Sequence, residues 1–315
     1  MFIIFGAPRS GTTLLSASLD QHPDIVIPDE SDFIVPLAFI CARIPDEVRG
    51  KELAERFILS SERFQDHLGP FLSPDKISRA ISEAPYRLEA ILDSLYGLVA
   101  ESAKKKISGD KSPNDLMGLR ILAKAGLFDG SLKVIHMVRD IRDVMSSLLK
   151  TGWIDGIEQT FPRAWAHANL ELGETMKKYP ERYCFIRYED LVREPEQQLR
   201  RVTEFLGVPF DPAVLSWENR GPRYQQFGHH QNISEPITTA RVGAWKKELD
   251  PKFIYLCETQ ARAGLAEFGY GIFQEDQSLR LIEIAKETEN VRKTNQALEA
   301  KFRENDELIQ MTNNE

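Results

Sequence analysis

The sequence predicts an α/β protein built on a parallel β-sheet of the P-loop type, flanked by helices. Three short apolar segments, bounded by turn or charged residues, have the composition of buried strands: residues 2–5 (FIIF), 132–138 (LKVIHMV) and 183–187 (YCFIR). Long segments with helical periodicity separate them. Strands that alternate with helices form parallel sheets through right-handed crossovers, and ligands bind at the carboxyl ends of their strands.

The helical segments show apolar residues that recur every three or four positions. They cover roughly residues 47–67, 85–104, 142–149, 162–178 and 195–206. The chain has 315 residues, of which 42% are hydrophobic, so it can bury a full core. We expect the α/β domain to span residues 1–273.

Composition and charge restrict the partners and the compartment. The formal net charge of −8 gives no support to a nucleic-acid partner, so any phosphate site has to be built locally. The three cysteines are widely separated and form no C-x-x-C pair, which indicates reduced core thiols: Cys41, Cys184 and Cys257. No apolar segment has the length of a membrane span, and residues 2–5 are too few for a signal peptide. These features predict a cytoplasmic protein.

The first predicted strand runs directly into a glycine-rich turn and a helix, with the sequence GAPRSGTT over residues 6–13. This order presents backbone N–H groups and the positive end of the helix dipole to an anion. In an ATP-binding loop the residue after the second glycine is a lysine that neutralises the β and γ phosphates, and here it is Thr12. The loop therefore predicts a shorter anion at the 5′ position of a nucleotide, with Arg9 supplying the charge.

A second anion site is predicted where the strand 132–138 ends. This strand delivers Arg139 to its carboxyl end, and the helix that follows carries Ser147. The two residues are eight positions apart, which is about two helical turns, so both side chains can converge on one anion.

Taken in chain order, three motifs resemble those of the sulfotransferase superfamily. They are PRSGTTLL (residues 8–15) followed by LDQHP (19–23), then RDIRD (139–143) with Ser147, and RYEDL (187–191). The resemblance covers roughly residues 2–273. It implies transfer of a sulfuryl group from 3′-phosphoadenosine 5′-phosphosulfate, with adenosine 3′,5′-bisphosphate as product. It also implies that no metal is used, and it accounts for the missing lysine, because this donor has no γ-phosphate to reach.

The resemblance assigns cofactor residues position by position. They are the 5′-phosphosulfate loop Arg9, Ser10, Gly11, Thr12 and Thr13, the 3′-phosphate pair Arg139 and Ser147, and Tyr188 near the adenine. A late motif, ARVGAWK over residues 240–246, is similar to a further cofactor segment of the family. Gly243 stands where the tyrosylprotein enzymes have a serine, so we expect Arg241 or Thr239 to supply the missing hydrogen bond.

The chain is most similar to the tyrosylprotein sulfotransferase branch and its bacterial relatives, which implies the catalytic residues. A glutamate twenty-one residues after the loop arginine corresponds to Glu30. A carboxylate beside the acceptor hydroxyl can take its proton, which contributes roughly 10²- to 10⁴-fold. Lys111, in the segment SGDKSP (108–113), corresponds to a donor to the transferring group, and Arg9 is the second charge stabiliser.

The identity of the base stays open at this stage. Asp29 and Asp32 are close rivals of Glu30, and His229 and His230 are weaker candidates. Both histidines fall in residues 217–239, which are rich in Gly, Pro, Asn, Gln and His. A loop this long in a compact domain is usually functional or disordered, and we favour a lid that faces the substrate.

After residue 273 the composition changes. Residues 274–315 contain no proline or glycine, and Ile284, Val291 and Leu298 recur every seven positions. Polar residues interrupt the same seam. We expect a separate helical tail that forms a weak coiled coil with a second copy or packs on a partner, with a frayed solvated helix as the alternative.

Two other functions compete with sulfuryl transfer. A P-loop kinase-like phosphotransferase shares the loop and the fold but requires the lysine that is absent. A non-catalytic nucleotide-binding scaffold, assembled through the tail, predicts damaged catalytic positions, whereas Arg9, Glu30 and Lys111 are all present. The acceptor hydroxyl is expected on a carbohydrate, a lipid-linked molecule or a natural product, with tyrosine less favoured.

Overall fold

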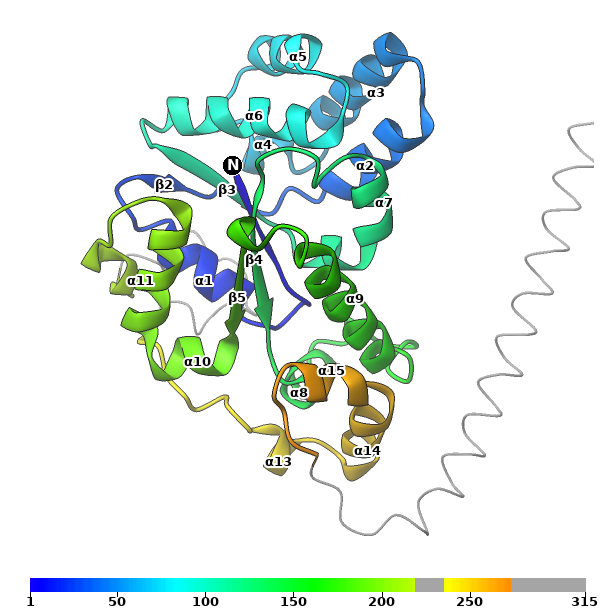
Figure 1. Cartoon of the computed structure of the whole chain (residues 1–315), viewed down its shortest axis with the longest axis vertical. Helices are drawn as coiled ribbons and strands as arrows, with labels where there is room; N and C mark the ends of the chain where they lie inside the picture. Colours follow the sequence, from blue (N-terminus) through cyan, green and yellow to red (C-terminus); the bar gives the residue numbers. More distant parts are fainter. Residues whose placement is uncertain (219–234, 273–315) are drawn as a thin grey trace, which may run out of the picture. The chain divides into compact units, whose positions relative to one another are not determined.

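Five parallel strands form one sheet, in the order β2-β3-β1-β4-β5 (Figure 1). The structure is a computed structural model, and it describes residues 1–218 and 235–272. The strands are β1 (Phe2–Phe5), β2 (Ile25–Val26), β3 (Ile107–Lys111), β4 (Lys133–Val138) and β5 (Tyr183–Arg187). Every pairing between neighbours is parallel, so the carboxyl ends of all five strands lie at the same edge of the sheet.

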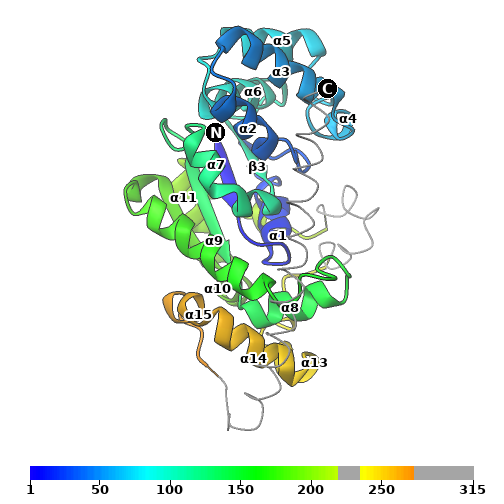
Figure 2. The ribbon, with the colours of Figure 1, turned by 90° about the vertical axis from the view of Figure 1, so that its right-hand side faces the viewer.

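Helices connect the strands and cover both faces of the sheet. The α-helices are α1 (Thr12–Leu19), α2 (Ile34–Arg43), α3 (Glu47–Ser60), α4 (Phe64–His67), α5 (Pro74–Glu83), α6 (Leu88–Ser102), α7 (Leu119–Lys124), α8 (Ile141–Leu149), α9 (Phe161–Met176), α10 (Tyr188–Arg193), α11 (Pro195–Leu206), α13 (Trp245–Glu248), α14 (Pro251–Gln260) and α15 (Arg262–Glu267). Three short 3₁₀ helices occur at Pro113–Gly118, Pro180–Arg182 and Pro212–Leu215. In both views α3, α5 and α6 lie at one end of the molecule, and α13, α14 and α15 lie at the other (Figure 2).

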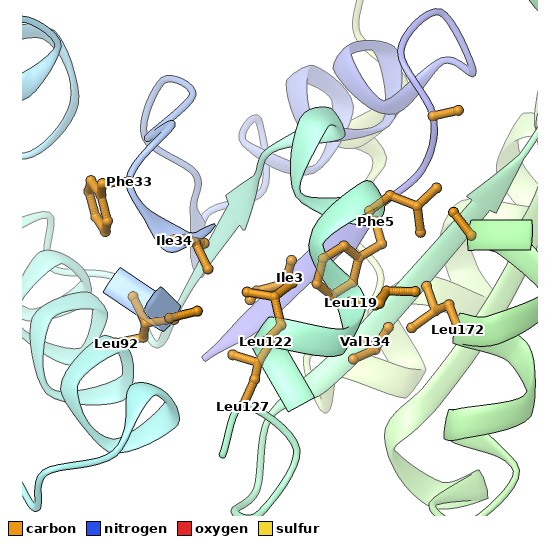
Figure 3. Close-up of a cluster of buried hydrophobic side chains, with 14 of the residues drawn as sticks. Ile3, Phe5, Phe33, Ile34, Leu92, Leu119, Leu122, Leu127, Val134 and Leu172 are labelled. Atoms are coloured by element: carbon orange, nitrogen blue, oxygen red, sulfur yellow. The ribbon is translucent and has the colours of Figure 1, made fainter. Parts of the chain in front are cut away.

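The two faces of the sheet belong to two hydrophobic clusters, because successive side chains of a strand point to opposite faces. In β1, Ile3 and Phe5 join the larger cluster, to which α6, α7 and α9 contribute (Figure 3). Phe2 and Ile4 join the smaller one, formed with α1, α10 and α11. All four side chains are fully buried, which explains why β1 reads as a continuous apolar run.

Capping residues define several of the helix ends. The side chain of Asp140 accepts a hydrogen bond from the backbone N–H of Arg142 at 2.9 Å and caps α8. Asp46 and Asp250 cap α3 and α14 in the same way. At the other end, Gly207 terminates α11 with a φ of 84°, a left-handed conformation that favours glycine.

The predicted fold class is confirmed, and all three predicted strands are present. β4 begins at Lys133, one residue later than expected, and the predicted helix over 47–67 is two helices, α3 and α4. Two strands were not predicted. β2 has only two residues, and β3 has the sequence ISGDK, whose polar and charged residues hide the strand pattern.

Some predictions fall outside the described residues. The proposed lid lies largely within residues 219–234, which include His229 and His230, and the predicted helical tail lies within residues 273–315. The domain boundary at residue 273 and the coiled coil therefore stay predictions. Among the helices of residues 1–218 and 235–272, none is long and apolar enough to cross a membrane.

His136, in the centre of β4, shows how completely the core is desolvated. Its side chain is fully buried, Nε2 lies 2.9 Å from the Asn169 side-chain oxygen, and Nδ1 lies 2.7 Å from the Tyr183 hydroxyl. A neutral ring satisfies both contacts, with Nε2–H donating to Asn169 and Nδ1 accepting from Tyr183. Burial lowers the pKa of His136 to about 4.

This lowered pKa predicts a loss of stability in mild acid. In the unfolded chain the imidazole takes up a proton near its ordinary pKa of 6.5, while the folded state resists protonation down to about 4. The stability that His136 contributes is therefore present above pH 6.5 and is lost as pH falls towards 4, by about 3 kcal/mol. Urea unfolding at a series of pH values should show a shallower pH dependence for His136→Gln than for wild type. Identical slopes would contradict the assignment.

Candidate active site

Four strand ends bring distant parts of the sequence together. The loop Gly6–Gly11 follows β1, Lys111 ends β3, Arg139 follows β4, and Tyr188 follows β5. Because all four strands are parallel, these groups meet at one edge of the sheet. The predicted anion residues therefore converge, although up to about 180 positions separate them in sequence.

The loop after β1 has the conformation of a phosphate-binding loop. Arg9 has a φ of 67° and Gly11 a φ of 92°, and α1 begins at Thr12. Two left-handed residues turn the chain so that the amino end of α1 faces the edge of the sheet. A Cβ at Gly11 would lie 2.5 Å from the Tyr188 ring, so this position requires glycine both for its φ and for the close approach.

Arg139 connects three segments of the site. Its Nη1 donates to the carbonyl oxygen of Arg9 at 3.0 Å, and its Nη2 donates to that of Arg241 at 2.8 Å. Its guanidinium lies over the Tyr188 ring, 4.4 Å from the centroid. One buried cation thus fixes the loop, the start of α10 and the late motif relative to one another.

Arg9 contacts Ser147 on one side and Trp153 on the other. Its Nε donates to the Ser147 hydroxyl at 2.9 Å, and its guanidinium lies 5.6 Å from the centre of the Trp153 ring. Burial, and then repulsion from Arg139, lower the pKa of Arg9 from its usual range. A bound anion relieves this repulsion, so two adjacent arginines favour a negatively charged ligand.

These residues line a cavity of about 880 Å³, which we call the donor cavity. Besides Arg9 and Arg139 it is lined by Gly11, Thr12, Thr13, Ser147, Tyr188 and Arg241. Within the described part of the chain, the buried Ser10 hydroxyl and the buried Nε of Arg139 have no hydrogen-bond partner. Buried polar groups are normally satisfied, so these two suit an anionic ligand such as a nucleotide phosphate.

The late motif contributes to the donor cavity mainly through its backbone. The carbonyl oxygen of Arg241 accepts from Arg139, while the exposed Arg241 side chain pairs with Glu248 at 3.3 Å. Glu248 also accepts from Lys150 at 2.6 Å, and these contacts lower its pKa. The Gly243 backbone N–H donates to Asp143 at 2.7 Å, so this glycine, with a φ of 70°, anchors the segment to α8.

Glu30 and Lys111, the expected base and the expected donor to the transferring group, form an ion pair. The Lys111 side chain is 5% exposed, that of Glu30 27%, and Lys111 Nζ also lies 3.3 Å from the Thr13 hydroxyl. The lysine therefore contacts the phosphate loop on one side and the carboxylate on the other. Its three N–H donors allow it to hold both while it faces a third group.

The rivals of Glu30 are engaged differently. The Asp32 carboxylate pairs with Arg63 at 2.9 Å, and Asp32 has a left-handed φ of 52°. Burial raises the pKa of Asp32, although Arg63 opposes that shift. The backbone carbonyl of Asp29 accepts a hydrogen bond from the buried His67. Among these three carboxylates, Glu30 is the one that pairs with Lys111.

A second cavity, of about 730 Å³, opens on the other side of this ion pair, and we call it the acceptor cavity. It is lined by Glu30, Lys111, Asp29 and Asp32, and by apolar residues of 148–164. The donor and acceptor cavities share four lining residues, which are Arg9, Thr12, Thr13 and Trp153. The phosphate loop is therefore the wall at which the two cavities meet.

Two features of the site were not predicted from the sequence. One is Trp153, and the other is a set of buried polar residues near Glu30: Ser31, His67, Tyr96, Asp110 and Ser112. Trp153 falls in a segment of turns between α8 and α9, where an aromatic residue has no periodic pattern to mark it. Its position in a loop is the one available signal, because binding residues often lie on loops. The buried polar residues lie on four separate segments, so only folding reveals them.

The site has the strand–loop–helix layout of a P-loop protein, with two adjacent arginines and without the lysine of ATP-binding loops. The model of the sulfotransferase family matches residues 2–212, and the chain belongs to this family. It is 27% identical over 261 residues to protein-tyrosine sulfotransferase of Drosophila melanogaster, covering 78% of this chain and 46% of that protein. With carbohydrate sulfotransferase 1 of Mus musculus it shares 27% identity over 170 residues, covering 48% and 41%. The chain thus spans about half the length of these curated relatives.

Solved structures agree with the fold. The sulfotransferase domain of the Synechococcus PCC 7002 olefin synthase has a TM-score of 0.56 and 25% identity, covering 87% of this chain and 95% of that domain. The sulfotransferase domain of the curacin biosynthetic pathway has a TM-score of 0.58 and 22% identity, covering 87% and 98%. Because its identity is only 22%, the second structure supports the fold assignment alone.

The crowded position of Gly11 yields a testable prediction. Gly11→Ala places a methyl group against Tyr188 at a left-handed φ, which should destabilise the protein by about 1–3 kcal/mol and weaken nucleotide binding. Gly97→Ala is the matched control, because a Cβ there meets nothing within 4 Å and the residue lies inside α6. It should stabilise the fold by about 0.5–1 kcal/mol. Urea unfolding and titration with adenosine 3′,5′-bisphosphate measure both effects, and equal behaviour of the two variants would contradict this reading.

Proposed function

We propose that this protein transfers a sulfuryl group from 3′-phosphoadenosine 5′-phosphosulfate to an acceptor hydroxyl. The observation that carries the proposal is the position of the Glu30–Lys111 pair, which lines the acceptor cavity. Lys111 Nζ lies 3.3 Å from the hydroxyl of Thr13, a residue that lines both cavities. Family membership supports the reaction class, and the donor cavity supports the nucleotide.

The donor cavity offers a distinct group for each charged part of the cofactor. Arg9 and the amino end of α1 face the 5′ position, while Arg139 and Ser147 suit the 3′-phosphate. Tyr188, held against Gly11 and under Arg139, provides an aromatic face for the adenine. When bound, the cofactor supplies an electrophilic sulfur and a phosphate leaving group.

Different side chains have different roles in the proposed transfer. Glu30 takes the proton of the acceptor hydroxyl, which makes the oxygen a better nucleophile. Lys111 and Arg9 hold positive charge beside the loop, where negative charge develops as the reaction proceeds. Thr12, in place of a lysine, leaves the loop without a group for a terminal phosphate.

Calorimetric titration tests the nucleotide assignment. Adenosine 3′,5′-bisphosphate should bind tightly without magnesium, because Arg9, Arg139 and the loop supply all the compensating charge. Magnesium-ATP should bind much more weakly. A preference for magnesium-ATP would favour the kinase-like alternative and contradict the proposal. Binding of the bisphosphate with no transfer to any hydroxyl would instead favour the scaffold.

The substitution Glu30→Gln tests the assignment of the base. It keeps the size of the side chain and removes its basicity, so turnover should fall roughly 10²- to 10⁴-fold. Affinity for adenosine 3′,5′-bisphosphate should stay within about twofold, because Glu30 lies outside the donor cavity. Asp32→Asn is the comparison variant, since Asp32 lines the same cavity and pairs with Arg63. A larger loss of turnover in Asp32→Asn than in Glu30→Gln would assign the base to Asp32.

A further inference from the structure

The first inference rests on the proposed function and concerns the acceptor. The wall of the acceptor cavity opposite Glu30 is apolar. It is formed by Met117, Leu148, Trp153, Ile154, Ile157 and Phe161. Three of them are unusually exposed for large hydrophobic side chains, with Met117 at 44%, Trp153 at 51% and Ile157 at 53%. Exposed apolar side chains gathered in a concave site mark the binding of an apolar ligand.

Four of the charged groups that line the acceptor cavity form two ion pairs, and Arg9 and Asp29 also line it. Glu30 pairs with Lys111, and Asp32 pairs with Arg63 at 2.9 Å. A carbohydrate placed here would bring many hydroxyl groups against the apolar wall and lose their hydrogen bonds to water. An anionic acceptor would face the carboxylates of Asp29 and Asp32. A single hydroxyl on an apolar body meets neither obstacle.

We propose that the acceptor is an alcohol carried on an extended apolar body, with its hydroxyl at Glu30 and its hydrocarbon against Met117, Trp153 and Ile157. The cavity volume of about 730 Å³ is in the range of pockets that enclose a small organic molecule. Trp153 lines both cavities, so the apolar body of the acceptor reaches the wall of the donor cavity.

A series of primary alcohols from butanol to decanol tests this class. With 3′-phosphoadenosine 5′-phosphosulfate as donor, kcat/KM should rise up to about fourfold for each added methylene until the cavity is filled, the factor that corresponds to ~0.8 kcal/mol. Glucose and a tyrosine peptide are the comparison acceptors. Better transfer to either of these, with no dependence on alcohol length, would overturn the inference and leave the proposed function intact. No transfer to any acceptor would overturn both.

A substitution in the apolar wall separates binding from general damage. Ile157→Asn should lower kcat/KM for octanol about tenfold, because it places an amide against the hydrocarbon, and should leave affinity for adenosine 3′,5′-bisphosphate unchanged. Val48→Asn is the matched control, because Val48 is an aliphatic residue on α3 that is 68% exposed, against 53% for Ile157, and lines neither cavity. Equal effects of the two variants would overturn the inference.

A binding measurement adds a readout that needs no turnover. Octanol should shift the tryptophan emission of wild type to shorter wavelength as Trp153 loses water, and Trp153→Phe should remove that shift. A shift that persists in Trp153→Phe would place the alcohol elsewhere and count against the inference.

A second inference rests on a different observation, a buried chain of polar side chains behind the Glu30–Lys111 pair. His67, Tyr96, Asp110, Ser112 and Ser31 are each no more than 1% exposed. They come from α4, α6, the end of β3, the residue after β3 and the segment of Glu30. We call them the buried relay.

The contacts of the buried relay hold the chain neighbours of both Glu30 and Lys111. His67 Nδ1 donates to the backbone carbonyl of Asp29, and Ser31 Oγ lies 3.1 Å from Ser112 Oγ, so the residues on either side of Glu30 are held. Asp110, which immediately precedes Lys111, is hydrogen-bonded to the Tyr96 hydroxyl and accepts from Ser112 at 2.6 Å. His67 Nε2 lies 3.0 Å from the Tyr96 hydroxyl and closes the chain.

Counting protons shows that the relay needs one more than a neutral histidine, a tyrosine and an ionised aspartate supply. Three hydrogen bonds link the Asp29 carbonyl, His67, Tyr96 and Asp110, and each needs a proton. A neutral histidine and a tyrosine bring two, and a carboxylate brings none. The third proton therefore resides on His67 or on Asp110. Burial raises the pKa of Asp110, which favours keeping that proton.

We propose that the buried relay is a positioning unit that aligns Glu30 with Lys111 and works only while it holds this third proton. The titratable and charged groups that interact with Asp110 are Lys111 on β3, Asp115 on the following 3₁₀ helix and Asp32 on the segment of Glu30. On α4, His67 Nε2 lies 4.0 Å from the Asp110 carboxylate. Below the pKa of the relay all three hydrogen bonds form. As pH rises through that pKa the proton is lost, one bond opens, and the Glu30 segment loosens.

Two conservative variants test the buried relay. Tyr96→Phe breaks the chain, so kcat should fall about 10- to 100-fold, as expected for a misplaced catalytic group, with little change in affinity for adenosine 3′,5′-bisphosphate. In Asp110→Asn the amide donates to Tyr96 and its oxygen accepts from Ser112, so the chain is complete without the extra proton. In a pH profile, kcat of wild type should decline at alkaline pH as the relay proton is lost. Asp110→Asn should retain most of kcat and lack that decline.

Three outcomes would overturn the positioning role. Loss of nucleotide affinity in step with kcat in Tyr96→Phe would indicate general misfolding. Asp110→Asn with the alkaline decline of wild type would show that the relay proton is not the titrating group. A fall in kcat as large in Asp110→Asn as in Tyr96→Phe would show that hydrogen-bond completeness is not what matters.

Discussion

The site depends above all on the placement of the Arg139 guanidinium. It is buried, donates to the carbonyls of Arg9 and Arg241, and lies over the ring of Tyr188. A buried cation is costly unless it is compensated, and here carbonyl dipoles and an aromatic face supply part of that compensation. The carboxylate of Asp143, on the same wall of the donor cavity, also interacts with Arg139. The same contacts that fix the loop thus place two arginines, Arg9 and Arg139, where the proposed nucleotide phosphates would add further compensation.

The segment after residue 235 belongs to the site because α8 holds it through buried charge. Arg142 pairs with Asp140 at 2.7 Å and with Glu258 of α14 at 2.5 Å, and it lies 4.0 Å from the centre of the Trp245 ring. Asp143 accepts from two backbone N–H groups of the late motif. Loss of one partner would leave an uncompensated buried charge, so these pairs fix one arrangement of α8 against the late motif. The carbonyl of Arg241 reaches Arg139 as a result.

The sequence allowed the prediction of those parts whose local pattern is strong. β1, β4 and β5 are apolar runs, and the loop after β1 has a spacing that few other structures require. β3 was not predicted, because Asp110 and Lys111, which lie at the candidate site, interrupt the apolar pattern of a strand. The relevance of Glu30 and Lys111 came from resemblance alone, since their ion pair joins positions 81 residues apart. The buried relay could not be predicted, because hydrogen bonds between distant segments leave no period in a sequence.

The proposed reaction gives a reason why the two cavities differ in chemistry. Sulfuryl transfer to an alcohol competes with transfer to water, so the acceptor side benefits from excluding water, while the donor side needs charge to hold a polyanion. The acceptor cavity has an apolar part beside its ion pairs, the donor cavity holds Arg139 and Arg241, and Thr12, Thr13, Arg9 and Trp153 form the boundary. Because Trp153 contacts the acceptor cavity with its ring and also lies near the Arg9 guanidinium, a filled acceptor cavity removes water from the arginine that supports the donor. In that drier setting the positive charge of Arg9 acts more strongly on the transferring group, which links occupancy of the acceptor cavity to stabilisation of the transition state.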